Sequence, residues 1–123
     1  MPEKPIGQIM WRDLTVKDAD QIKDFYSAVV GWKSQPVSMG DYDDFNMNLP
    51  ESGETVAGVC HARGGNADLP AQWMMYVRVA DAQTSVETVQ KMGGAVLQGP
   101  RTMGEETYYV IRDPAGAVLT IFS

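Results

Sequence analysis

Two halves of the chain repeat the same order of elements, and this internal repeat limits the possible folds more than any other feature. When the sequence is shifted by 63 residues, identical residues coincide at helix starts, turns and strand ends. A repeat of this kind predicts one supersecondary unit that is built twice. The coinciding pairs are Val16 with Val79, Asp18 with Asp81, Ala19 with Ala82, Gly31 with Gly94, Gln35 with Gln98 and Gly53 with Gly116.

The first half, over about residues 7–62, predicts one strand, one helix and three further strands. Asp18 precedes apolar residues at helical spacing and is a candidate helix cap, and Gly31 is a candidate stop. Gly and Pro turns separate the later segments. The expected strands cover residues 7–14, 32–38, 42–49 and 55–62.

The second half, over about residues 72–123, follows a connector rich in Gly, Asn and Pro. Asp81 is its candidate helix cap, and the expected strands cover residues 73–79, 95–98, 107–112 and 117–122. The chain is therefore predicted to be a single α+β domain of two βαβββ modules, which is a normal size for 123 residues.

Composition excludes several classes of function. The net charge is −6 and no cluster of Lys and Arg is present, so a nucleic-acid partner is not expected. No apolar run approaches the roughly 20 residues that span a membrane. A single cysteine, Cys60, and an N-terminus without an apolar core predict a cytoplasmic protein.

Five segments in this order resemble the vicinal oxygen chelate superfamily, which includes glyoxalases, bleomycin resistance proteins and extradiol dioxygenases. The subgroup that the chain most resembles is that of small bacterial glyoxalase-like proteins. The resemblance implies that the two modules form an open, barrel-like cleft. The segments are DFYSAVVGW from Asp24, TVAGV from Thr55, PAQWMMYVRVAD from Pro70, KMGGAVLQGP from Lys91 and RDPAGAVLTIF from Arg112.

Enzymes of that superfamily hold a divalent metal with His and Glu ligands on the first and last strands of each module. The resemblance places these positions at Trp11, Ala57, Met74 and Thr120. An indole and a methyl group do not bind divalent metals, a thioether is a soft ligand and a hydroxyl a weak one. A shift by one residue, for example to Gly58, does not restore a metal site. We therefore expect no metal and no cofactor.

His61 and Asp13 are the candidates for acid–base catalysis. His61 is the only histidine, and its ordinary pKa near neutrality suits a general acid or base. The competing and preferred interpretation is a solvent-facing histidine at the end of a strand. Cys60 is expected to pack as a small apolar side chain.

Aromatic and methionine side chains on the expected strands suggest a binding surface for an apolar or planar molecule, although each could equally be core. The predicted ligand-binding residues are Trp11, Ala57, Met74, Tyr76, Arg78 and Thr120. Three functions remain open: a metal-independent small-molecule binding protein, a glyoxalase-like enzyme that uses acid–base chemistry without a metal, and a protein-interaction domain with a vestigial groove. A homodimer is expected, because half-barrel modules leave strand edges to cover.

Overall fold

The computed structural model describes residues 5–123 and divides into two compact units. The first unit is Arg12–Trp73, and the second unit is Met74–Ser123 together with the described residues before Arg12. This division differs from the modules expected from the sequence, because the start of the chain joins the second unit. There, Gly7 N–H donates to the Arg78 carbonyl at 2.7 Å and Arg78 N–H donates to the Gln8 carbonyl at 3.0 Å.

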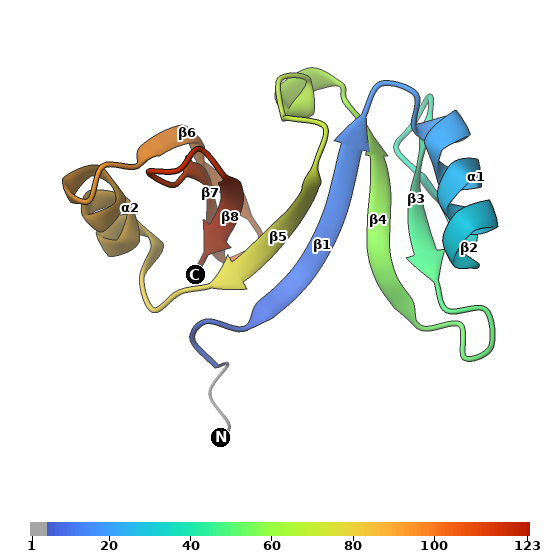
Figure 1. Ribbon diagram of the computed structural model, residues 1–123, viewed down its shortest axis with the longest axis horizontal. Helices are drawn as coiled ribbons and strands as arrows, with labels where there is room; N and C mark the ends of the chain where they lie inside the picture. Colours follow the sequence, from blue (N-terminus) through green and yellow to red (C-terminus); the bar gives the residue numbers. More distant parts are fainter. Residues whose placement is uncertain (1–4) are drawn as a thin grey trace. The chain divides into compact units, whose positions relative to one another are not determined.

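In the first unit, one helix packs against one face of the sheet (Figure 1). Its strands are ordered β2-β3-β4-β1, and β1 pairs with β4 in parallel while the other neighbours are antiparallel. β1 begins before the unit boundary. The elements are β1 (Ile9–Val16), α1 (Ala19–Val30), β2 (Lys33–Ser38), β3 (Asp43–Asn48) and β4 (Thr55–His61), followed by a short 3-10 turn, η1 (Gly64–Asn66).

The second unit repeats this arrangement. Its strands are ordered β5-β8-β7-β6, and β5 pairs with β8 in parallel while the other neighbours are antiparallel. The elements are β5 (Trp73–Arg78), α2 (Ala82–Lys91), β6 (Ala95–Met103), β7 (Glu106–Arg112) and β8 (Val118–Phe122). The predicted α+β fold of two βαβββ modules is confirmed. The first strand lies two residues later than predicted, and β6 is longer than predicted.

Each helix covers a separate hydrophobic core. Under α1, buried Ala19, Phe45, Met47, Ala57 and Val59 pack together. Under α2, the corresponding cluster is Ala82, Val86, Tyr109, Ile111 and Ile121. Neither helix is long and apolar enough to cross a membrane, among the residues that the structure describes.

The two predicted helix caps differ. The Asp81 carboxylate accepts a hydrogen bond from Thr84 N–H at 3.0 Å and so caps α2. Asp18 occupies the cap position of α1 but makes no side-chain capping bond, so that part of the prediction is wrong. Gly31 ends α1 in the left-handed conformation, as predicted, with φ of 94°.

A β-bulge in β4 corrects the alignment of the two modules. Asn48 pairs with Thr55 and Met47 pairs with Ala57, so Val56 is an extra residue on this strand. Beyond the bulge, Asp13 pairs with Gly58, as Tyr76 pairs with Thr120. Gly58 rather than Ala57 is therefore the structural equivalent of Thr120. Ala57 lies in the core under α1, 1% exposed.

Candidate binding face and relationship to known proteins

The second unit has a sheet face that points away from α2, which we call the distal face. Side chains alternate along a strand, and Tyr109, Ile111 and Ile121 pack with α2. Their neighbours Tyr108 and Phe122 therefore point to the distal face. Tyr76 and Arg78 join that face, because they pair with Thr120 and Phe122.

Three aromatic rings form a continuous cluster on the distal face. Tyr108 stacks on Phe122 with ring centroids 5.0 Å apart and planes at 14°. Tyr76 meets Tyr108 edge to face at 6.3 Å. The Arg78 guanidinium lies over the Phe122 ring, with its central carbon 4.8 Å from the centroid. We call Tyr76, Tyr108 and Phe122 the aromatic cluster; offset and edge contacts of this kind are the favourable ones between rings.

The charge of Arg78 is balanced within the same unit. Its Nη2 donates to both carboxylate oxygens of Glu106 at 3.3 Å. The Arg78 side chain is only 12% exposed and that of Glu106 is 28% exposed. Burial, and then the Glu106 charge, raise the pKa of the Tyr108 hydroxyl, while Arg78 opposes the rise. Tyr108 therefore stays protonated and neutral at ordinary pH.

Two buried polar atoms have no hydrogen-bond partner among the described residues. They are Arg78 Nε, a donor, and Gln98 Oε1, an acceptor. Gln98 in β6 pairs with Val110 in β7, which pairs with Thr120 in β8. Native proteins satisfy nearly all buried polar groups with protein, water or ligand, so a water molecule or a ligand is expected at these two atoms.

The corresponding face of the first unit is polar instead of aromatic. Asn48 donates to Gln35 Oε1 at 3.0 Å and accepts from the Thr55 hydroxyl at 2.7 Å. These side chains therefore bond to one another. Four rings of the first unit pack with the core under α1, namely Tyr26, Trp32, Phe45 and Trp73. There, Trp73 Nε1 donates to the Tyr26 hydroxyl at 3.1 Å.

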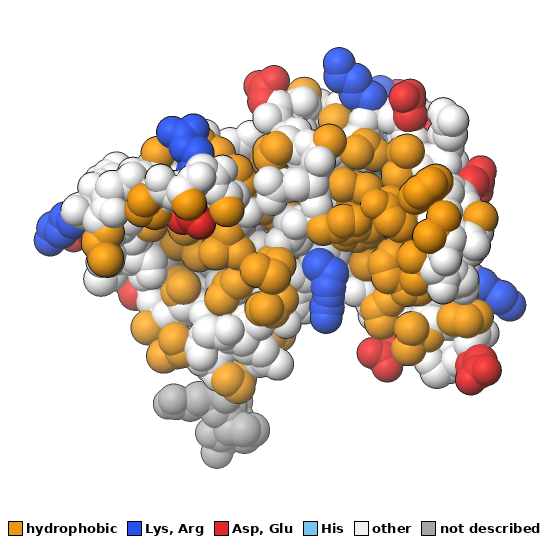
Figure 2. Space-filling view, viewed as in Figure 1, with side chains coloured by type: hydrophobic (Ala, Val, Ile, Leu, Met, Phe, Trp, Pro, Cys, Tyr) orange, Lys and Arg blue, Asp and Glu red, His pale blue; other side chains and the backbone are white. Residues whose placement is uncertain are grey.

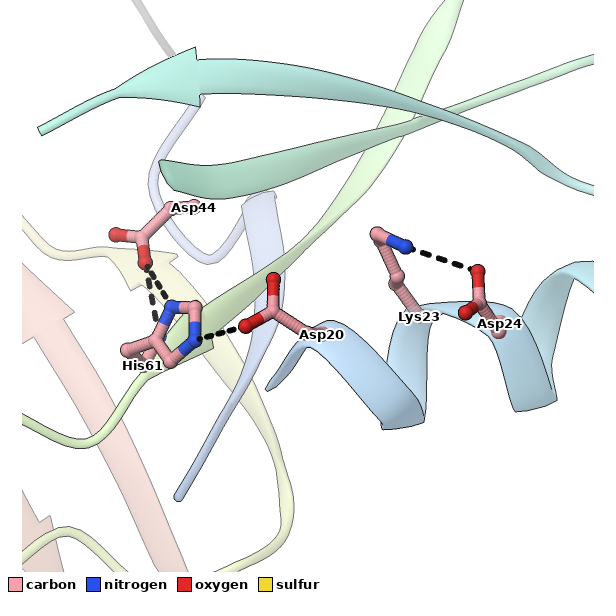
Figure 3. A network of polar contacts seen from close by, with 5 residues as sticks. All are labelled: Asp20, Lys23, Asp24, Asp44 and His61. Atoms are coloured by element: carbon pink, nitrogen blue, oxygen red, sulfur yellow. Dashed lines mark hydrogen bonds and ion pairs between the residues drawn. The ribbon is translucent and has the colours of Figure 1, made fainter. Parts of the chain in front are cut away.

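His61 lies between two carboxylates (Figure 3). Its Nδ1 is 3.4 Å from Asp44 Oδ1 in β3, and its Nε2 is 3.3 Å from Asp20 Oδ2 in α1. The His61 side chain is 11% exposed, so the expectation of a solvent-facing histidine is wrong. Both ring nitrogens have carboxylate partners, so His61 connects α1, through Asp20, to β3 of the sheet, through Asp44.

Cys60 and Asp13 lie near this connection. Burial is the largest cause that raises the pKa of the Cys60 thiol to about 12, and the charges of Asp13 and Asp44 raise it further. A thiol with this pKa is a poor nucleophile. This agrees with the expected packing role of Cys60. Asp13 pairs with Gly58 on the neighbouring strand, and its catalytic role remains a prediction.

Residues 6–121 match the profile of the Glyoxalase/Bleomycin resistance protein/Dioxygenase superfamily. The chain belongs to this superfamily. Among curated proteins, it is 30% identical to an anthracycline biosynthesis protein, DnrV, of Streptomyces peucetius, over 94% of the chain and 46% of the relative. It is 26% identical to a putative glyoxylase, CFP32, of Mycobacterium tuberculosis, over 94% of the chain and 43% of the relative. The chain thus spans about half the length of these curated relatives.

Solved structures of the superfamily share the fold. A member from Vibrio splendidus has a TM-score of 0.59 at 11% identity, with 91% of this chain and 95% of that one covered. A methylmalonyl-CoA epimerase in complex with methylmalonyl-CoA has a TM-score of 0.56 at 14% identity, with 96% and 94% covered. Identities this low support the fold alone.

The superfamily's metal positions hold residues that do not suit a metal. Met74 and Thr120 are 3% and 2% exposed in the second unit, and Trp11 is half-buried. The fourth position is occupied by Gly58, which has no side chain. No three His, Cys, Asp or Glu residues are grouped to hold a metal anywhere in residues 5–123. The side chains present therefore do not fit the divalent metal of the superfamily's enzymes.

The predicted set of ligand-binding residues lacked four residues of the distal face, namely Gln98, Glu106, Tyr108 and Phe122. None of them occupies a ligand position of the superfamily. Strand alternation gave a signal for Phe122, because it lies two residues after Thr120 on the same strand. No sequence pattern indicated that Glu106 would reach Arg78.

Proposed function

We propose that this protein binds a planar small molecule on the distal face of its second unit, without a catalytic metal. The observation that carries the proposal is the aromatic cluster with Arg78 over one of its rings. Aromatic side chains bind flat molecules by stacking, and a few polar groups beside them fix the orientation. Of the predicted binding residues, Tyr76 and Arg78 are kept as ligand contacts. Met74 and Thr120, which are 3% and 2% exposed, are kept as buried residues that support them.

Charge on the distal face favours a neutral ligand. Glu106 balances Arg78, and the net charge of the chain is −6. The face therefore offers hydrogen-bond donors without a net positive field. A ring system with carbonyl and hydroxyl groups fits this description. Anthracyclines, which the name of one relative mentions, are planar polycyclic quinones.

An enzymatic role without a metal is less well supported. His61 belongs to the first unit, and both of its ring nitrogens have carboxylate partners. Asp13 also belongs to the first unit, and its raised pKa makes the Cys60 thiol a poor nucleophile at neutral pH. The second unit offers Tyr108 and Glu106, of which Glu106 pairs with Arg78. Turnover of a dicarbonyl or an epimerisable acid in the presence of a chelator would favour an enzymatic role without a metal.

A titration with quinizarin (1,4-dihydroxyanthraquinone), a neutral planar hydroxyquinone, tests the proposal. We expect saturable binding in EDTA, and binding about tenfold weaker in Tyr108→Ala, since one ring contact contributes about 1 kcal/mol beyond buried area. The matched control is Tyr42→Ala in the first unit. Absence of binding would favour a protein-interaction domain, and equal weakening in both variants would contradict this location of the site.

A further inference from the structure

The helix-covered side of the second unit contains a cavity that the proposed function does not use. Its volume is about 380 Å³, and it lies between α2 and the strands β7 and β8. Apolar side chains form most of its wall, including Val79, Val89, Met92, Ile111 and Ile121. These residues lie on the opposite side of the sheet from the distal face, so this cavity is a separate feature.

The internal repeat explains why the cavity exists. The two helices can be aligned from their cap positions, Asp18 and Asp81. The alanines that follow, Ala19 and Ala82, are 0% and 1% exposed. In this alignment, Ile22 of α1 corresponds to Ser85, and Tyr26 corresponds to Val89. Two large side chains of the first unit are thus replaced by two small ones in the second.

The same replacement occurs just after the helix. Gly31 and Gly93 both have left-handed φ values, of 94° and 88°, and the next strands begin at Lys33 and Ala95. Trp32 therefore corresponds to Gly94, rather than Gly31 to Gly94 as the sequence alignment suggested. Ser85, Val89 and Gly94 all line the cavity.

In the first unit, aromatic side chains stand at two of these positions, Tyr26 and Trp32, and the ring of Trp73 packs against both. Trp73 lies 5.1 Å from Tyr26 and 5.8 Å from Trp32 between ring centroids, and all three pack against the core under α1. The indole N–H of Trp73 donates to the Tyr26 hydroxyl. Trp73 comes from the start of β5, outside the β1–β4 elements. In the described part of the second unit, no indole packs against the core under α2.

We propose that the α2 cavity binds a neutral bicyclic aromatic molecule with one N–H or O–H donor, which takes the place of the ring that Trp73 supplies in the first unit. An apolar protein cavity of about 150 Å³ holds benzene, so one of about 380 Å³ accommodates two fused rings. Arg112 and Asp113 at the wall carry opposite charges, so the cavity favours neither an anionic nor a cationic ligand.

The hydroxyl groups along one wall supply the acceptor for the ligand's donor. Thr84 Oγ1 donates to the Asp81 carboxylate at 2.5 Å, and Thr88 Oγ1 donates to the Thr84 carbonyl at 3.2 Å. Their protons are engaged within the helix, while the hydroxyl oxygens still have lone pairs for an incoming N–H. This arrangement parallels the bond that Trp73 makes to Tyr26.

An NMR titration of the full chain with indole tests the proposal. We expect saturable shifts at the amides of residues 84–94 and 111–113, and an increase in the thermal midpoint. Val89→Tyr and Ser85→Ile restore the bulk of the first unit, so each is expected to weaken indole binding about tenfold or more. Gln90→Ile places the same side chain as Ser85→Ile on the same helix but outside the cavity wall, and it is expected to bind indole like the natural chain.

Three results would overturn the proposal. Indole could cause no saturable shifts in the natural chain, or the folded Val89→Tyr and Ser85→Ile variants could both bind it unchanged. The shifts could instead fall only on Tyr76, Tyr108 and their neighbours, which would place indole on the distal face. Failure of quinizarin binding leaves this test unaffected, because the two sites use different side chains.

Discussion

Arg78 is the residue on which the binding face depends most. Its guanidinium contacts the Phe122 ring and pairs with Glu106, and its Nε is buried without a partner among the described residues. One side chain thus combines a cation–π contact, an ion pair and a free donor. Arg is suited to this because its planar group stacks and donates in fixed directions.

Replacement of this cation tests that role. We expect Arg78→Met to weaken quinizarin binding about tenfold, because the variant keeps the bulk over Phe122 but removes the donors. Arg63→Met is the matched control, since Arg63 also lies over a ring, at 4.0 Å from Tyr42, but in the first unit. Isothermal titration of both variants gives the comparison. Equal affinities would show that Arg78 does not contact the ligand.

The Cys60 thiol provides a pH-dependent prediction. Burial raises its pKa from 9.0 to about 12, so the folded chain holds this proton more tightly than the unfolded chain does. The contribution to stability is complete below pH 9 and is lost as pH rises from about 9 to 12. We expect a disulfide reagent to modify the folded protein far more slowly at pH 8 than the protein in guanidinium. Similar rates in both states would contradict the assigned burial.

The N-terminus of α2 has a side-chain hydrogen-bond cap, and that of α1 has none. Asp81 accepts from both the backbone and the hydroxyl of Thr84, and the hydroxyl bond is the largest cause that lowers its pKa. Asp18 makes no capping bond. We expect Asp81→Ala to lower the urea midpoint more than Asp18→Ala does. The difference should shrink as pH falls below 3.8, since a depressed carboxyl pKa stabilises only above its unfolded value.

The elements also show how far sequence reasoning extends. The repeat predicted both βαβββ modules, because caps, turns and helical spacing are local signals. The alignment of the two modules was wrong at Ala57, because β4 has a bulge at Val56. The bulge depends on how β4 pairs with β3, and no local sequence pattern indicates it. His61 was misjudged for a similar reason, since its partners Asp20 and Asp44 come from two other elements.

For the whole molecule, exposed apolar side chains on α1 bear on association (Figure 2). Phe25, Val29 and Val30 are 55%, 64% and 51% exposed. Large exposed apolar residues on one element are typical of an interaction surface. The homodimer remains a prediction.

Light scattering at micromolar concentration tests this association. We expect a mass about twice that of one 13.5 kDa chain, and a shift toward the single-chain mass in Phe25→Glu with Val29→Lys. The paired charges replace apolar surface that is exposed in one chain, so the fold should be retained. A natural chain that runs at the mass of one copy would contradict the dimer.

The distal face is proposed to bind a planar ligand without a metal. The most direct measurement is an NMR titration of EDTA-treated protein with quinizarin, followed through the ring signals of Tyr76, Tyr108 and Phe122. We predict saturable shifts of these rings, with the same affinity whether or not EDTA is present in the titration. Binding that appears only after a metal is added, or that leaves these three rings unshifted, would contradict the claim.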